Sequence, residues 1–141
     1  MENKRKKILI VDDLKAWRES IASILENEDY SLDFAATLEN AQKKLKQEKF
    51  DLCIIDIRLQ EDVDYNVEGI DLLEWIHKNK QGQPPAIILT GHATEALKQK
   101  ADWYKAFAFL EKSPKANDFD LDRVEFLNII EQALKKRHKR K

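Results

Sequence analysis

The sequence is poor in the residues that build disulfide scaffolds, repeats and linkers. It has one cysteine, one methionine, three glycines and three prolines among 141 residues. A single cysteine excludes a disulfide bond within the monomer, and because Cys53 lies inside an apolar run, we expect a buried, inert thiol. No internal repeat or low-complexity linker interrupts the sequence, so we expect one folded domain that buries roughly 70% of its unfolded surface.

Long apolar runs are also missing, since each run is only as long as a β-strand. The basic residues at 4–7 lead directly into the apolar residues 8–11 and then into Asp12 and Asp13. This N-terminal pattern is too short and too acidic for a secretory signal. We therefore expect a cytoplasmic protein.

Basic residues are outnumbered between the two ends of the chain. The formal net charge is −1, but 10 of the 25 Lys and Arg residues lie at 4–7 and 135–141, which leaves an acidic body. An acidic body argues against general nucleic-acid binding, which needs a basic face that displaces counterions. We expect a folded domain at 8–134, a basic tail at 1–7 and a second basic tail at 135–141, both solvated.

Two hydrophobic periods alternate along the chain. Short β-type runs are expected at 7–11, 30–35, 50–57, 86–90 and 106–110. Amphipathic helical patterns follow them at 14–25, 38–45, 70–76, 94–104 and 121–136, with Thr37 as N-cap of the second and Asp118 or Asp120 as cap of the last. This alternation predicts an α/β fold, a doubly wound, flavodoxin-like (βα)5 domain whose five-stranded parallel sheet has the order 2-1-3-4-5.

Three aspartates end two neighbouring strands of this sheet. Asp12 and Asp13 follow the first strand, and Asp56 follows the third. In the predicted order the chain reverses direction between these strands, and ligands bind outside the carboxyl ends at that point. Clustered carboxylates repel one another, so we expect a cation, and Mg²⁺ prefers hard oxygen ligands together with phosphate. The alternative is that each aspartate only caps the helix or turn that follows it.

The fourth and fifth strands bring complementary groups to the same crevice. Thr90 ends the fourth strand and Lys112 follows the fifth. A hydroxyl donor and an ammonium group are what a transferred phosphoryl group requires, because its oxygens carry the developing charge. Each signal is weak alone, since Thr is a common strand former and Lys a common surface residue. Their placement beside three aspartates favours phosphoryl chemistry.

The ordered motifs resemble the receiver domain of two-component response regulators, from residue 8 to about residue 134. The motifs are Val11-Asp12-Asp13, Ile54-Ile55-Asp56-Ile57, Ile88-Leu89-Thr90-Gly91 and Phe109-Leu110-Glu111-Lys112. The resemblance implies a single-domain phosphoacceptor module that works with Mg²⁺. It also implies that a histidine kinase or phosphotransfer protein supplies the phosphoryl group, and that the module catalyses its own phosphorylation and dephosphorylation rather than a conventional turnover reaction.

The resemblance also assigns roles to individual residues. Asp56 would be the phosphoacceptor, and Thr90 and Lys112 would bind phosphoryl oxygens. Asp13, Asp56 and the Arg58 backbone carbonyl would bind Mg²⁺ directly, with Asp12 acting through water. Phe109 would change rotamer on activation, although a buried core Phe is the plain alternative. The side chains of Arg58 and His92 would tune the lifetime of the phosphoryl group, with a solvated loop histidine as the alternative.

The chain departs from the receiver pattern in three places. The segment between Asp56 and Gly69 is several residues longer than usual and has Gln60 where Pro is common. We expect its acidic part at 59–68 to be a solvated, partner-specific loop, since its acids lack the Gly-centred spacing of a calcium loop. Lys105 stands where Gly often precedes the fifth strand. Ser113 separates Lys112 from Pro114, so the cis peptide of the family is either absent or placed at Ser113-Pro114.

Other function classes fit less well. A haloacid-dehalogenase-like phosphatase needs D-x-D after its first strand, and a flavodoxin-like electron carrier needs a Gly- and hydroxyl-rich phosphate loop there. A receiver-like docking module that acts without phosphorylation stays open as an alternative.

We expect no attached catalytic or DNA-binding domain and no membrane contact. Output would therefore pass to a protein through the face of the fourth helix, fifth strand and fifth helix, with Trp103 and Tyr104 nearby. The sequence does not name the kinase, the output partner or the oligomeric state.

Overall fold

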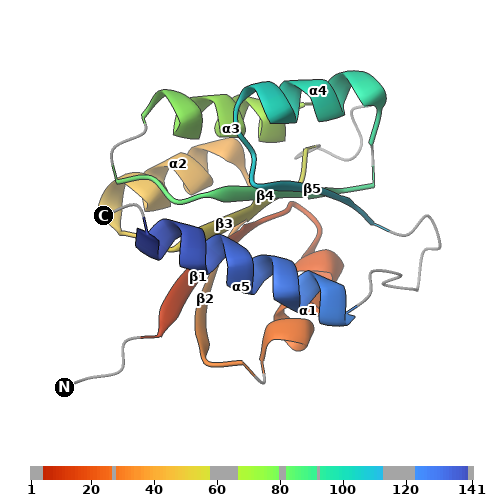
Figure 1. Cartoon of the computed structure of the whole chain (residues 1–141). Helices are drawn as coiled ribbons and strands as arrows, with labels where there is room; N and C mark the ends of the chain where they lie inside the picture. The colour runs from red at the N-terminus through yellow and green to blue at the C-terminus, as the bar shows by residue number, and fades with distance from the viewer. Residues whose placement is uncertain are drawn as a thin grey trace.

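The computed structural model describes residues 5–26, 28–57, 67–79, 82–91, 93–112 and 123–139. Five parallel strands form one sheet in the order β2-β1-β3-β4-β5, and helices alternate with them along the chain (Figure 1). The predicted fold class and strand order are therefore confirmed. The elements are β1 (Lys6–Val11), α1 (Lys15–Leu25), β2 (Tyr30–Ala35), α2 (Leu38–Gln47), β3 (Leu52–Ile55), α3 (Glu68–Lys78), β4 (Ala86–Thr90), α4 (Glu95–Trp103), β5 (Ala108–Glu111) and α5 (Arg123–Lys139).

Helices cover both faces of the sheet, which explains the continuous apolar runs of the central strands. Figure 1 shows α2, α3 and α4 on one side and α1 and α5 on the other. Successive strand residues point to opposite faces. Leu9 and Val11 accordingly pack in the cluster with α2, α3 and α4, whereas Ile8 and Ile10 pack in the cluster with α1 and α5. A strand buried on both sides has no polar face to display.

Several element boundaries differ from the sequence expectations. β3 is shorter than 50–57, and β5 begins at Ala108 rather than at 106. α5 continues to Lys139 and so enters the segment 135–141 that was expected to be a solvated tail. The Thr37 cap is confirmed, because its side chain accepts a hydrogen bond from the Asn40 N–H at 3.1 Å. The expected caps Asp118 and Asp120 lie outside the described residues.

The single cysteine is fully buried in β3. Burial raises the pKa of the Cys53 thiol far above its ordinary value, because the thiolate would lose its hydration. The expected inert thiol is therefore confirmed. No helix among the described residues has the length and apolar character needed to cross a membrane.

Lys105 ends α4 in a left-handed backbone conformation. Its φ is 64°, the one positive value at a non-glycine residue in the described part of the chain. The Lys105 N–H donates to the Asp102 carbonyl, and the Ala106 N–H donates to the Ala101 carbonyl at 2.9 Å. These two bonds form a Schellman motif, in which glycine is favoured because it has no Cβ. The motif also explains why β5 starts late, since Ala106 still belongs to the helix cap.

We predict that Lys105→Gly stabilises the protein. Glycine adopts a positive φ without the Cβ clash that lysine tolerates, so the free energy of unfolding should rise by about 0.5–1 kcal/mol. Urea unfolding measures the change. Lys105→Ala is the matched control, because it removes the same side chain but keeps Cβ. Equal stabilisation by alanine and glycine would contradict the conformational explanation.

Candidate functional site

The sheet itself places two of the three aspartates. The Asp12 N–H donates to the Ala35 carbonyl of β2 at 3.0 Å, and the Asp56 N–H donates to the Val11 carbonyl of β1 at 2.9 Å. Both aspartates thus follow their strands while the backbone is still hydrogen-bonded to a neighbouring strand. These bonds fix the backbone at the carboxyl ends of β1 and β3. The Asp12 and Asp56 side chains therefore leave the sheet at the same edge, as predicted.

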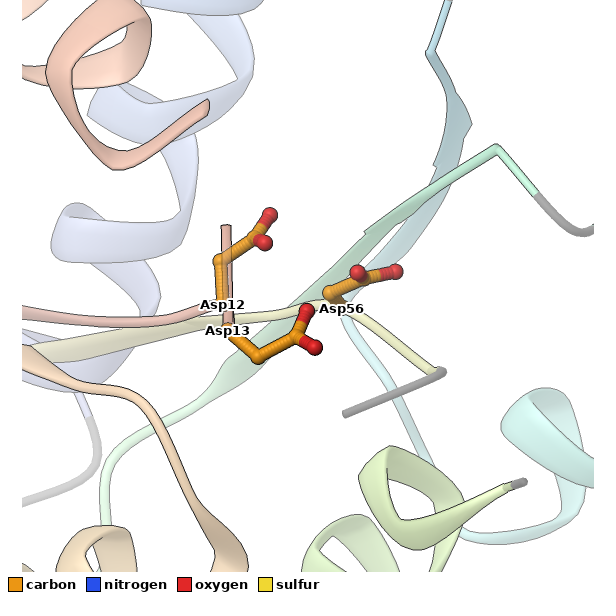
Figure 2. Close-up of side chains that lie close together, drawn as sticks. All are labelled: Asp12, Asp13 and Asp56. Atoms are coloured by element: carbon orange, nitrogen blue, oxygen red, sulfur yellow. The ribbon is translucent and has the colours of Figure 1, made fainter. Parts of the chain in front are cut away.

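The three carboxylates meet at this edge. One oxygen each from Asp12, Asp13 and Asp56 lies within 4.8 Å of the others. Figure 2 shows the Asp13 side chain extending toward Asp56. Asp12 and Asp56 are buried, and Asp13 is half-buried. A set made only of carboxylate oxygens suits a hard divalent cation such as Mg²⁺ better than a soft metal. The residues present therefore fit the expected metal.

Lys112 supplies positive charge to the same cluster. Its ammonium Nζ lies 2.7 Å from Asp12 Oδ2 and 3.3 Å from Asp56 Oδ2. The Lys112 backbone N–H donates to the Thr90 carbonyl at 2.9 Å, and Thr90 is fully buried at the end of β4. The structure thus brings the Lys112 ammonium to Asp12 and Asp56, as the sequence predicted, and places Thr90 at the end of the strand next to Lys112.

The cluster is electrostatically costly in the absence of a further cation. Burial raises the pKa of the Asp12 carboxyl above its ordinary value, and the neighbouring Asp13 carboxylate adds to the rise. The Lys112 ammonium and the hydrogen bond from the Leu14 N–H act in the opposite direction. Since burial dominates, ionised Asp12 destabilises the folded state, and a divalent cation would relieve this cost.

Gly69 lets α3 approach the backbone beside Asp56. Its N–H donates to the Ile57 carbonyl at 2.7 Å. A Cβ at this position would lie 2.0 Å from the Asp56 carbonyl oxygen and 2.5 Å from Ile57 Cα. Only glycine fits such a contact, so the first turn of α3 is held against the site by a residue that has no side chain.

Other predicted residues have different outcomes. Phe109 lies on β5, half-buried, and packs on the cluster with α3 and α4. Arg58, His92, the greater part of the acidic loop at 59–68 and the Ser113-Pro114 bond lie outside the described residues. Sequence reasoning treated Trp17 only as part of the apolar stripe of α1, but its ring lies beside Lys112. The available signal was an aromatic residue in the first turn of a helix that begins directly after Asp13.

Comparisons with known proteins agree with this geometry. The model of the response regulator receiver domain matches residues 8–121. A putative NtrX-like response regulator from Rickettsia bellii is 35% identical over 111 residues, covering 79% of this chain and 22% of that protein. The crystal structure of a CheY-like receiver domain protein from Methanospirillum hungatei has a TM-score of 0.81 and 31% identity, and covers 98% of this chain and 100% of that one. The chain spans about a fifth of the length of the curated relatives it matches.

We predict that Asp13→Asn stabilises the metal-free protein near neutral pH. The substitution removes a charge that repels ionised Asp12, so the free energy of unfolding at about pH 7 should rise, although burial remains the larger cause of the raised pKa. The folded-state pKa of Asp12 is raised above 3.8. Its contribution to stability is therefore present below that value and lost as the pH rises through the folded pKa, so the gain should shrink toward acidic pH.

Thermal unfolding with and without Mg²⁺ tests the same substitution. Millimolar Mg²⁺ should raise the midpoint of the native protein, because a ligand that binds only the folded state stabilises it, and should raise that of Asp13→Asn much less. Asp29→Asn, at an exposed position, is the control. A metal-free Asp13→Asn protein less stable than the native one at neutral pH would overturn the repulsion argument.

Proposed function

This chain belongs to the response regulator receiver family, whose members are two-component phosphoacceptor modules, and we propose that Asp56 is the residue that accepts its phosphoryl group. The observation that carries the assignment is the convergence of three carboxylates and one buried ammonium at the ends of three strands, β1, β3 and β5. Asp56 Oδ2 lies 3.3 Å from the Lys112 ammonium, and the Asp13 side chain extends toward Asp56 (Figure 2). A nucleophile in that position has the Lys112 ammonium beside it, and the carboxylate oxygens that could bind a metal ion are its neighbours.

The proposed reaction is a transfer to the Asp56 carboxylate. One carboxylate oxygen attacks the phosphorus of a phosphohistidine or of a small donor such as acetyl phosphate, and forms a new P–O bond. The bond from phosphorus to the donor breaks, and its electron pair leaves with the imidazole nitrogen or the acetate oxygen. Lys112 and Thr90 would bind the phosphoryl oxygens, where charge develops. Water later attacks the acyl phosphate, which releases inorganic phosphate and restores the carboxylate.

The metal requirement follows from the same oxygen set. Asp13 and Asp56, with Asp12 through water and the Arg58 backbone carbonyl, would hold Mg²⁺. When bound, Mg²⁺ offsets the negative charge of the carboxylates and of the incoming phosphoryl group. Lys112 would then bind the phosphoryl oxygens in exchange for its carboxylate partners. The metal is thus proposed as a requirement for binding a second anion in an already acidic site.

Receiver domains take phosphoryl groups from histidine kinases and pass the signal to output domains. For this chain we propose that the output surface is the face of α4, β5 and α5, with Phe109 as the switch. A groove of about 400 Å³ lies between α4 and β5 and is bordered by Phe109, Ala106 and Lys98. Trp103 is 75% exposed, which suits a partner contact, whereas Tyr104 packs on the core and against His77. A cytoplasmic location stays a prediction.

We predict that acetyl phosphate adds the mass of one phosphoryl group to the protein only when Mg²⁺ or Mn²⁺ is present. Asp56→Asn should abolish the addition, because the amide is not a nucleophile at neutral pH. Intact-mass spectrometry measures the product, and Asp29→Asn is a control that removes an exposed carboxylate. Unchanged labelling of Asp56→Asn would show that another residue is the acceptor.

We also predict that beryllofluoride, which imitates the phosphoryl group, changes amide chemical shifts from Asp56 through Thr90 to Phe109 and the region of Trp103. The physical reason is that an anion drawing Thr90 inward frees space for the Phe109 ring and biases two arrangements of the output face. Lys112→Ala should keep metal binding but lose the distant changes. Changes confined to the metal site in the native protein would favour a docking module that acts without phosphorylation.

A further inference from the structure

The ammonium group of Lys112 has a third neighbour besides its two carboxylate partners. Its Nζ lies 4.6 Å from the centroid of the Trp17 ring. The Lys112 side chain is only 5% exposed, so this contact is made away from bulk water. Cation–π attraction is strongest for tryptophan and increases when the cation is desolvated. The contact is therefore in the setting where such an interaction has its greatest effect.

We propose that Trp17 is a positioning residue that holds the Lys112 ammonium in place while its anionic partners exchange. This inference rests on the proposed function of the site. It adds an aromatic side chain from α1 to a set of residues that otherwise comes from the ends of β1, β3, β4 and β5.

The first turn of α1 is anchored to the site at two points. The Leu14 N–H donates to Asp12 Oδ1 at 3.0 Å, and the Arg18 guanidinium Nη1 donates to the Asp12 backbone carbonyl at 2.7 Å. Trp17 lies between these anchors, and its own N–H donates to the Leu14 carbonyl. The helix therefore cannot shift along its axis without breaking bonds to Asp12, and the ring is held at a fixed place beside Lys112.

The ring differs from the carboxylates in what it can bind. Asp12 and Asp56 hold Lys112 in the metal-free protein, but both are proposed metal ligands, and Asp56 becomes an acyl phosphate. Each of those changes weakens an attraction on which Lys112 depends. An indole face offers no ligand atom to Mg²⁺ and does not repel a phosphoryl group as a carboxylate does. It can thus attract the ammonium through every stage of the transfer.

The first test uses the native protein without phosphorylation. A side chain that lies over an aromatic face is shielded by the ring current, so the Lys112 Hε protons should resonate upfield of those of the other lysines. The shift should persist after beryllofluoride and Mg²⁺ are added, since the ring is proposed to retain its cation. Lys112 Hε protons at the ordinary lysine position in the metal-free protein would overturn the proposal, whatever the labelling experiments on Asp56 show.

The second test compares Trp17→Leu with Trp17→Phe. Leucine keeps an apolar side chain but loses the ring face, so the rate constant for labelling by acetyl phosphate and the affinity for beryllofluoride should fall about tenfold. Phenylalanine keeps a smaller ring and should restore most of both, with the Lys112 Hε protons still shifted. Equal loss in the two variants would mean that Trp17 only packs, and native values in Trp17→Leu would mean that the ring does not act on Lys112.

Phe34→Leu is the matched control, because it makes the same kind of change at a 37% exposed aromatic beside α1. It should leave the labelling rate and the Lys112 shift unchanged, and a fall equal to that of Trp17→Leu would overturn the specific role of Trp17. Circular dichroism and Mg²⁺ binding establish that each variant is folded. If Trp17→Leu is unfolded, Trp17→Phe and the native spectrum decide the question. If acetyl phosphate does not label the native protein at all, the proposed function is wrong, but the contact between Trp17 and Lys112 is not contradicted.

Discussion

Burial of clustered carboxylates at the ends of β1 and β3 is the constraint on which the site depends. The strand order forces the two strands that carry them to be neighbours, and backbone hydrogen bonds fix where each chain leaves the sheet. Lys112 lowers the pKa of Asp12, but burial raises it more, so the ionised carboxylate stays costly in the folded protein. The fold therefore keeps buried negative charge at the carboxyl edge of the sheet. This charge favours binding of a metal ion, and the bound metal in turn favours binding of an anion.

The parts that the sequence predicted are those set by the sheet alone. Asp12 and Asp56 each follow a strand, and the two strands are neighbours, so a correct strand order was enough to bring them together. Lys112 followed for the same reason. Trp17 was not predicted as a site residue, because an aromatic on a helical stripe looks the same whether it meets a core residue or a buried ammonium. The deciding information was the bonding of α1 to Asp12, which no periodicity reveals.

Boundaries were harder to predict than elements. Ala106 and Phe107 are apolar and resemble the start of a strand, but the Schellman bonds that follow α4 keep Ala106 in the helix cap. The sequence did not indicate this cap, because the residue with positive φ is Lys105 and not the glycine that usually marks such a position. The extension of α5 to Lys139 is similar: lysine and arginine are good helix formers and suit a helix C-terminus, so a basic run does not by itself end a helix.

The close contact of Gly69 with the backbone of Asp56 and Ile57 fixes the start of α3 beside the site. This position does not depend on the length of the connection that precedes α3. The Gly69 N–H and the Ile57 carbonyl are hydrogen-bonded, so the two residues that bound this connection are held against each other. Closing a flexible loop costs only about 0.6 kcal/mol more for each doubling of its length. A change in the length of this connection should therefore cost little free energy, as long as the contact that holds α3 beside Asp56 is kept.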